Sequence, residues 1–406
     1  MPEIKDDLEK VTLPTLKEYD VSGKNVLVRV DLNVPMHNGR INDFSRLVAI
    51  RDTVSYLLKH QAKVILLSHF GRPQPENNPT KWDLGYSLEV LVPDLASVLG
   101  HPVHFIPHYA GPLVSRALSE QTNVHVFLLE NIRYAVGEET NSQDLARQLA
   151  QGMDLYVNEA FSCSHRAHAS LEAITHVLPS VAGFNLQKEV AYLERCLSHP
   201  AHPVTAIVGG SKVSTKLSLL ENLAQKVDIL VIGGAMANTF LAAQGHTIGA
   251  SVFEPAFLPM ARKVLATPGV TLVLPQDVIV ASHLEADHGI HRNLDSIQKD
   301  EKIFDIGPNT VQHIISLLYS SKTIVWNGPV GAFEYPPFEK GTWNIAQALA
   351  NVTSQGVLTV AGGGDTLSAL NSLGLKDQLS HVSTAGGAFL EWLEGKDLPA
   401  IQALRP

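Results

Sequence analysis

The sequence has 406 residues, 45% of them hydrophobic, and a formal net charge of −9 at pH 7. A chain of this length and composition can bury more than one core, which excludes a disordered or fibrous protein. The acidic balance argues against general binding to nucleic acid or to anionic membranes, because both need a surplus of exposed Lys and Arg. Cys163 and Cys196 are the only cysteines, too few for a disulfide framework or a zinc site. Because the start carries no apolar signal segment and no run is long enough to span a bilayer, we expect a cytoplasmic protein without nucleic-acid or membrane partners.

Short apolar runs rich in β-branched residues recur along the chain and predict strands. They cover residues 25–30, 63–67, 124–129, 155–158, 205–208, 229–232, 271–275, 323–325 and 358–360. Stretches with helical periodicity lie between them, at 46–60, 87–99, 142–152, 215–225, 310–318 and 341–351. Strands alternating with helices predict the α/β class, and we expect doubly wound, Rossmann-like parallel sheets rather than a single barrel.

A domain boundary is predicted between residues 183 and 204. A helical stretch there ends in a linker with two prolines, Ser198-His-Pro-Ala-His-Pro203, and such a segment can act as a hinge. We therefore expect a first domain at 1–183, a hinge helix and linker at 184–203, and a second domain from 204 to 388.

Arginine and histidine motifs gather in the first half, where nine of the thirteen arginines precede residue 183. Guanidinium groups match carboxylates and phosphates two hydrogen bonds at a time, and ligands of open α/β sheets bind where strands end. The motifs at or after predicted strands are Arg29-Val-Asp31-Leu-Asn33, His69-Phe-Gly-Arg72, Asn131-Ile-Arg133 and His165-Arg166-Ala-His168. Each alone is compatible with an ordinary turn or a structural side chain. Together they predict a site for a small phosphorylated acid.

Cys163 lies near His165 and His168 in the sequence, so we considered whether it is a catalytic nucleophile activated by a histidine. Sequence proximity alone is no evidence of a thiolate, so we disfavour it.

Glycine-rich loops gather in the second half and predict a nucleotide site. Gly209-Gly-Ser-Lys212, with Lys216, follows a strand and precedes a helix, so its amides and lysines can meet phosphate oxygens. Gly362-Gly-Gly-Asp-Thr366 repeats the arrangement, with Asp365 suited to a nucleotide's Mg²⁺ and Thr366 expected to act like an N-cap that donates to phosphate. Neither loop is a Walker A motif or a dinucleotide fingerprint, which disfavours a P-loop ATPase and a nicotinamide-dependent dehydrogenase.

The ordered set of motifs resembles the phosphoglycerate kinase family along nearly the whole chain. The matching segments are 26–35, 67–73, 129–133, 165–170, 209–216, 325–329 with Phe333-Glu334, 362–366 and 390–395. The resemblance implies reversible, Mg²⁺-dependent phosphoryl transfer between 1,3-bisphosphoglycerate and ADP in glycolysis, giving 3-phosphoglycerate and ATP. It also implies a monomer that closes about its hinge, with a tail at 389–406 that returns to the first domain.

The resemblance also implies roles for individual residues. Those implied in catalysis are Arg46, Lys212 and Lys216. Those implied around phosphoglycerate are Arg29, Asp31, Leu32, Asn33, Arg46, His69, Phe70, Gly71, Arg72, Arg133 and Arg166. Those implied around the nucleotide are Gly209, Gly210, Lys212, Lys216, Gly233, Gly234, Asn327, Pro329, Glu334, Gly363, Gly364, Asp365 and Thr366, with Asp365 toward the metal. Gly386 and Gly387 resemble the start of a helix that faces the transferred phosphate.

Two segments depart from the family pattern. Ala385 stands where a third glycine is usual, and its methyl group would cost about 1 kcal/mol if the position needed a positive φ. Ser162-Cys163-Ser164 replaces the more usual Gly-Thr-Ala. Neither change removes a charged side chain, so we expect activity rather than the alternative, a non-catalytic nucleotide-binding relative of the same fold.

Overall fold

The computed structural model describes residues 13–76 and 78–405. Within these ranges the chain forms two compact units, which we call unit one (13–191 with 397–405) and unit two (192–396). The first boundary lies inside helix α7 (Phe184–Leu197), within the predicted hinge segment. The second lies later than expected, because residues 389–396 belong to unit two and only the segment from 397 onward returns to unit one.

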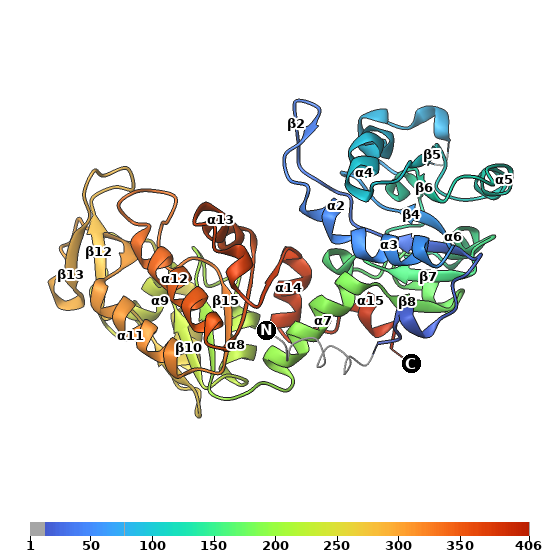
Figure 1. The fold of residues 1–406 in the computed structure, drawn as a ribbon. Coiled ribbons are helices and arrows are strands. Elements are labelled where there is room, and N and C mark those ends of the chain that lie inside the picture. The colour runs from blue at the N-terminus through green and yellow to red at the C-terminus, as the bar shows by residue number, and fades with distance from the viewer. Residues whose placement is uncertain (1–12, 77, 406) are drawn as a thin grey trace. The chain divides into compact units, whose positions relative to one another are not determined.

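Unit one is built on a six-stranded parallel sheet (Figure 1). Its strands in spatial order are β5 (His104–Ile106), β6 (Val126–Leu129), β4 (Lys63–Leu67), β1 (Asn25–Arg29), β7 (Leu155–Asn158) and β8 (Ser180–Ala182). A short antiparallel ribbon joins β2 (Met36–His37) to β3 (Arg40–Ile41). The first strand in sequence lies between β4 and β7, so the strand order reverses at β1, which is where doubly wound sheets bind ligands.

Alternation along the strands builds a core on each face of this sheet. Val26 and Val28 belong to one buried cluster, whereas Leu27 between them belongs to another, because successive strand residues point to opposite faces. The helices of unit one are α2 (Ser45–Ala49), α3 (Arg51–Lys59), α4 (Val92–Leu99), α5 (Pro112–Glu120), α6 (Gln143–Ala150), the start of α7, and α15 (Pro399–Gln402). Its 3₁₀ turns are η2 (Leu16–Glu18), η3 (Pro79–Lys81), η4 (Leu84–Tyr86), η5 (Leu88–Leu91), η6 (Ile132–Tyr134), η7 (Phe161–Cys163) and η8 (Ala173–His176). Two hydrophobic layers thus fix the sheet and the ends of its strands.

The returning tail is anchored in unit one. The Ala400 N–H donates to the carbonyl of Ser164 at 3.2 Å, and Ala400 packs in a buried cluster with Ala160, Cys163 and Leu171. The tail therefore supports the loop after β7.

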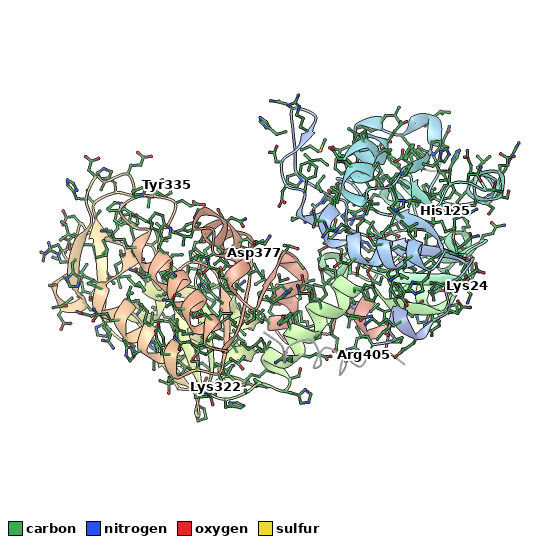
Figure 2. All side chains as sticks on the ribbon, in the orientation of Figure 1. Lys24, His125, Lys322, Tyr335, Asp377 and Arg405 are labelled. Atoms are coloured by element: carbon green, nitrogen blue, oxygen red, sulfur yellow. The ribbon has the colours of Figure 1, made fainter. Side chains whose placement is uncertain are left out.

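Unit two repeats the architecture. Its parallel sheet has the order β11 (Thr271–Val273), β10 (Ile229–Ile232), β9 (Val204–Val208), β15 (Thr323–Asn327), β16 (Leu358–Gly362) and β17 (His381–Ser383). Its helices are α8 (Leu217–Ala224), α9 (Met236–Ala243), α10 (Leu258–Leu265), α11 (Pro308–Ser320), α12 (Lys340–Ser354), α13 (Gly364–Ser372) and α14 (Gly386–Leu393), with 3₁₀ turns η9 (Pro255–Phe257), η10 (Leu294–Ser296) and η11 (Lys376–Gln378). Side chains fill the layers on both sides of each sheet (Figure 2). The prediction of two doubly wound α/β domains is confirmed.

The predictions lacked strand β17 and also a small antiparallel sheet of unit two. An antiparallel sheet of three strands, in the order β13 (Ile290–Asn293), β12 (Asp277–Ala281) and β14 (Lys302–Ile306), is inserted before α11. No helix within residues 13–76 and 78–405 has the length and apolarity needed to cross a bilayer.

Candidate active site

The predicted acid-binding residues of unit one meet at the carboxyl edge of its sheet. Arg29 is the last residue of β1 and His69 follows β4 by two residues, while Arg133 and Arg166 lie in the segments after β6 and β7. Parallel strands end at the same edge, so motifs far apart in the sequence converge there.

Arg46 is held in place by two neighbours. Its guanidinium pairs with a carboxylate oxygen of Asp31 at 2.7 Å and donates to the carbonyl of Asn33 at 2.7 Å. The side-chain oxygen of Asn33 in turn accepts the N–H of Gly71 at 2.8 Å. The Arg46 side chain is 31% exposed, so its guanidinium is oriented by the protein and still open to a ligand.

His69 is a neutral, buried side chain beside Arg29. Burial and the Arg29 guanidinium hold the pKa of His69 well below its usual range, although Asp31 acts in the opposite direction. The Arg29 side chain is fully buried and donates to Ser170 Oγ at 2.9 Å, with its far nitrogen 3.4 Å from His69 Nδ1. Arg29 therefore lies beneath the pocket as a support for His69, and its direct contact with a substrate stays a prediction.

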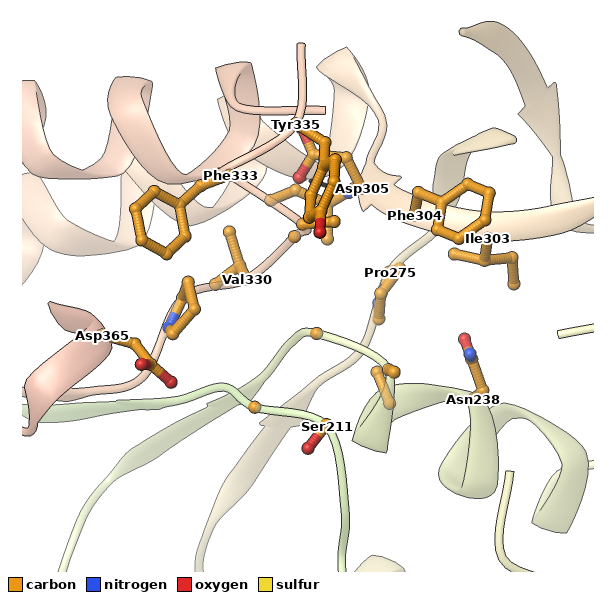
Figure 3. A pocket seen from close by; sticks show the side chains of 18 of the residues that line it. Ser211, Asn238, Pro275, Ile303, Phe304, Asp305, Val330, Phe333, Tyr335 and Asp365 are labelled. Carbon is orange, nitrogen blue, oxygen red and sulfur yellow. Dashed lines mark hydrogen bonds between the residues drawn. The ribbon is translucent and has the colours of Figure 1, made fainter. Parts of the chain in front are cut away.

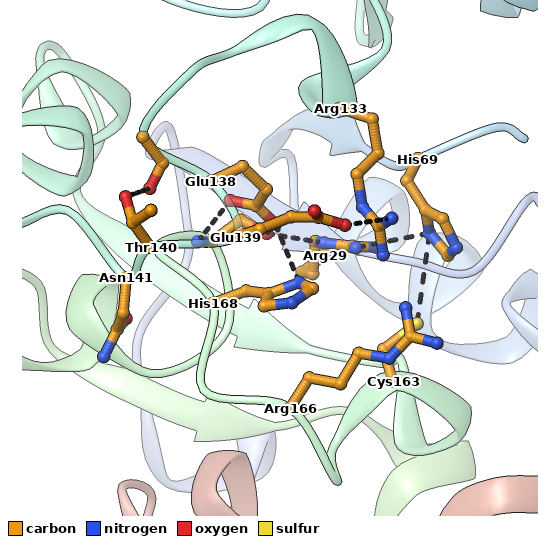
Figure 4. Close-up of polar contacts among 12 residues, drawn as sticks. Arg29, His69, Arg133, Glu138, Glu139, Thr140, Asn141, Cys163, Arg166 and His168 are labelled. Atoms are coloured by element: carbon orange, nitrogen blue, oxygen red, sulfur yellow. Dashed lines mark hydrogen bonds and ion pairs between the residues drawn. The ribbon is translucent and has the colours of Figure 1, made fainter. Parts of the chain in front are cut away.

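Three further arginines complete the basic pocket. Arg133 is 5% exposed and pairs with Glu139, and Figure 4 shows the side chains of Arg133 and Arg166 near His69. Arg166 is half-buried and Arg72 is exposed. Of the remaining predicted residues, Leu32 and Phe70 are buried in the core and Gly71 lies in the loop between His69 and Arg72.

Asn131 is a positioning residue that the sequence motifs contained but that the site prediction omitted. Its side-chain oxygen accepts the N–H groups of Phe70 and Arg133, at 3.1 and 3.0 Å. Its amide nitrogen donates to the carbonyls of Phe70 and Tyr86, at 2.7 and 2.8 Å. A buried asparagine between two arginine-bearing loops was the available signal, because such a group must find partners for its amide.

Asp31, His69 and Cys163 form the one cluster of potential metal ligands found in residues 13–76 and 78–405. Arg29 and Arg46 contact the first two of these side chains, and their positive charge opposes a cation there. Burial and Asp31 raise the pKa of the Cys163 thiol, so the thiol is protonated and the nucleophile interpretation gains no support. The cluster is part of the basic pocket.

The glycine-rich loops of unit two line a cavity of about 240 Å³ at the carboxyl edge of the second sheet. Figure 3 shows Phe333 and Tyr335 on one side and Ser211 on the other, with Asp365 near one end and Asn238 near the other. The wall also includes the predicted residues Gly210, Gly234, Pro329 and Glu334. The lining combines apolar side chains such as Val330 and Phe333 with polar ones such as Asn238 and Asp365, a mixture typical of small-molecule sites.

Lys216 lies beside the cavity-lining residue Gly210 and is held by several hydrogen bonds. Its ammonium donates to the carbonyl of Gly209 at 2.6 Å and to the side-chain oxygen of Asn327 at 2.7 Å. Burial lowers the pKa of Lys216 to about 8, although Asp365 acts to raise it. Lys212, in contrast, is exposed.

Gly209 has no space for a side chain. A Cβ at this position would lie 1.8 Å from the carbonyl oxygen of Pro329. The loops after β9 and β15 can thus approach each other only through a glycine. Gly233 follows β10 directly in the same way that Gly209 follows β9.

The loop after β16 corrects one expectation. Helix α13 begins at Gly364 with Gly363 as its N-cap, so Thr366 is inside the helix and not at its cap. Thr366 is fully buried, and its hydroxyl accepts the N–H of Gly328 at 2.7 Å. Asp365 stays exposed at the cavity.

The loop before α14 carries the Ala385 departure without strain. Ala385 has φ −95° and ψ 40° and precedes a helix that begins with Gly386 and Gly387. Because φ is negative, the methyl group costs no left-handed strain here. The concern raised by the missing glycine is removed.

The sequence missed much of the cavity wall. Pro275, Ile303, Phe304 and Asp305 line it from the segments around the inserted antiparallel sheet. Burial raises the pKa of Asp305 to about 8 although it accepts N–H groups from Ile306 and Gly341. These residues carry no phosphate-binding pattern, and their position depends on a sheet that was not predicted.

Comparison with known proteins decides the family. A sequence profile described as "Phosphoglycerate kinase" matches residues 16–396. The chain is 49% identical over 400 residues to the phosphoglycerate kinase of Azorhizobium caulinodans, covering 97% of this chain and 99% of that protein. It belongs to the phosphoglycerate kinase family. The phosphoglycerate kinase of Zymomonas mobilis is 48% identical over 390 residues, with 95% of this chain and 97% of that protein covered.

Solved phosphoglycerate kinases share the fold. The structure from Coxiella burnetii matches with a TM-score of 0.88 and 42% identity, covering 97% of this chain and 98% of that one. The structure from Pyrococcus horikoshii matches with a TM-score of 0.80 and 28% identity, with the same shares covered. As a phosphoglycerate kinase, the chain is a phosphotransferase of glycolysis with a carboxyl group as acceptor.

Proposed function

We propose that the basic pocket of unit one holds 3-phosphoglycerate or 1,3-bisphosphoglycerate, and that the cavity of unit two holds the magnesium complex of ATP or ADP. The observation that carries this assignment is the different chemistry of the two sites. Unit one presents guanidinium groups around a neutral His69, which suits a small molecule with several negative charges. Unit two presents backbone loops, one oriented lysine and an apolar wall, which suit a polyphosphate joined to a flat base.

The proposed reaction is a direct transfer. The bond between the phosphorus and the carboxyl oxygen of 1,3-bisphosphoglycerate breaks while a bond to a β-phosphate oxygen of ADP forms. That attacking oxygen is already ionised, so no general base is needed, and the neutral His69 is free to donate a hydrogen bond. Positioning and charge stabilisation must supply the acceleration.

Arg46 is proposed to stabilise the charge of the phosphoryl group in flight. Its guanidinium is already oriented by Asp31 and Asn33, which limits reorganisation during the reaction. Lys216 and Lys212 are proposed to guide the transferred phosphate from the nucleotide side. Gly386 and Gly387, at the start of α14, are proposed to offer N–H groups to the same phosphate.

The residues present fit a magnesium ion that arrives with the nucleotide. Asp365 is an exposed carboxylate at one end of the cavity, and a single hard oxygen ligand suits Mg²⁺ shared with phosphates. When bound, the ion would neutralise phosphate charge. Asp365 would hold it at the rim near Lys216.

The proposed substrates bind to different units, so transfer requires the units to close. Closure about α7 would bring the substrates together and exclude water, which otherwise hydrolyses an acyl phosphate. Small-angle scattering should show compaction only with both substrates bound. An unchanged radius of gyration would contradict closure.

We further propose a cytoplasmic monomer. Cys163 and Cys196 are both free and buried, as suits a reducing compartment. Size-exclusion chromatography with light scattering should give one chain's mass, 44.0 kDa, and a dimer would contradict the proposal.

A coupled assay tests the activity. ATP, 3-phosphoglycerate and Mg²⁺ should drive NADH oxidation through added glyceraldehyde-3-phosphate dehydrogenase, and omission of either substrate should abolish it. No turnover from a folded protein that binds ATP would instead support a non-catalytic relative.

A further inference from the structure

Side chains from distant parts of unit one cap the N-terminus of α7. The first N–H groups of a helix have no partners within it. Here the N–H of Phe184 donates to Thr53 Oγ1 at 2.9 Å, and those of Asn185 and Leu186 donate to the two carboxylate oxygens of Glu159, each at 3.0 Å. We call Thr53 and Glu159 the α7 joint.

The α7 joint is buried and tightly seated. Thr53 is fully buried and Glu159 is 3% exposed, and the Thr53 hydroxyl donates to Glu159 Oε1 at 2.5 Å. A Cβ on Gly183 would lie 2.3 Å from Glu159 Oε2, so the chain entering α7 approaches the carboxylate as closely as glycine permits. Burial raises the pKa of Glu159 to about 7, because a buried carboxylate loses the water that stabilises its charge.

Each member of the joint belongs to a segment that builds the basic pocket. The N–H of Glu159 donates to the carbonyl of Arg29 at 2.8 Å, and Ser162, three residues further on, donates through its hydroxyl to Asp31. Thr53 lies on α3, which follows α2 without a loop, and α2 carries Arg46. A shift of either segment must therefore move an acceptor of the α7 N–H groups.

We propose that the α7 joint transmits occupancy of the basic pocket to α7, and that Glu159 is a positioning residue for phosphoryl transfer. An anion bound to the guanidinium of Arg46 pulls on α2 and, through it, on α3, and Thr53 carries that displacement to the first turn of α7. The carboxylate is required because it accepts two N–H groups and a hydroxyl at once, and a neutral amide offers a single oxygen. This inference rests on the proposed closure, since α7 is one of the two chain segments that pass from one unit to the other.

The test compares Glu159→Gln with Asp277→Asn. Asp277 is a matched control, because it is also buried and accepts two N–H groups, of Asn309 at 3.0 Å and Thr310 at 2.8 Å, and the Thr310 hydroxyl at 2.6 Å at the start of α11 in unit two. We expect E159Q to lower kcat about tenfold and to lose ligand-induced compaction, while calorimetry shows an almost unchanged Kd for 3-phosphoglycerate. D277N should keep both the compaction and kcat.

A second pair covers the case in which E159Q fails to fold. Thr53→Ser keeps the hydroxyl and should behave as the wild-type protein, whereas Thr53→Val should lose compaction. If wild-type protein compacts and E159Q or T53V compacts equally well, the joint is refuted while closure stands. If wild-type protein with both substrates does not compact, closure itself is refuted and the joint with it.

Discussion

The two pockets are built in different ways. The pocket of unit one is formed by polar and charged side chains that hold one another, as Asp31 holds Arg46 and Asn131 holds the loop before Arg133. The pocket of unit two is formed largely by backbone brought close by glycine, as where Gly209 meets Pro329. A side-chain site loses function when one charge is removed, whereas a backbone site loses it when one atom is added.

The largest effect is expected from Arg46→Ala. Loss of an arginine that stabilises a phosphoryl group in flight should lower kcat by about 10³-fold or more, with nucleotide Kd unchanged because Arg46 belongs to the other pocket. Steady-state kinetics and calorimetry with ADP measure both quantities. Arg51→Ala, on the adjacent helix with a 55% exposed side chain, is the control. A matching loss of ADP affinity in R46A would assign Arg46 a different role.

The next effect probes the backbone pocket through Gly209→Ala. The added methyl group would lie against the Pro329 carbonyl and should separate the two loops, so ADP affinity should fall about 5- to 150-fold if the overpacking energy of about 1–3 kcal/mol is lost from binding. Binding of 3-phosphoglycerate should persist. Gly364→Ala, where a Cβ meets no atom within 4 Å, should cost much less. Equal losses in the two variants would argue against the steric explanation.

The comparison also explains what could be predicted from the sequence. Charged motifs at strand ends identified the basic pocket, because residue type and position already imply the chemistry. Asn131 was missed because its role depends on two loops that meet only in three dimensions. In unit two, Asp305 and Phe304 were missed because the antiparallel insertion that places them showed no signal that we recognised.

The boundaries show the same limit. The strand at 323 extends to Asn327, and the predicted cap Thr366 is inside α13. The position of Thr366 follows from packing, since its hydroxyl accepts the N–H of Gly328 and not a contact from solvent or ligand. A sequence pattern over a few residues cannot show a hydrogen-bond partner that lies elsewhere in the chain.

A pH effect should separate the pockets further. The pKa of Lys216 is lowered by burial to about 8, so in the free protein it loses its proton as pH rises through 8. Bound phosphate favours the charged form, so ADP affinity should fall as pH rises from about 7 to 9, by up to about tenfold per pH unit above the pKa. Calorimetry in buffers of different ionisation enthalpy should detect proton uptake.

Lys216→Met supplies the control for that prediction. It should bind ADP weakly and without this pH dependence. A wild-type affinity that stays flat between pH 7 and 9 would show that Lys216 keeps its proton throughout.

The smallest effect is expected from Ala385→Gly. The backbone there has φ −95°, so glycine gains nothing in the folded state and adds entropy to the unfolded chain. Thermal unfolding should show a loss of about 1 kcal/mol or less, with no gain in kcat. A clear increase in kcat would mean that the loop needs a conformation that alanine resists.

The stereochemistry of transfer tests the central claim most directly. ATP made chiral at the γ-phosphorus with sulfur and oxygen isotopes would be used to phosphorylate 3-phosphoglycerate. Direct transfer between substrates held by the two pockets predicts inversion of configuration at phosphorus. Retention would require a phosphorylated protein intermediate and would contradict the account.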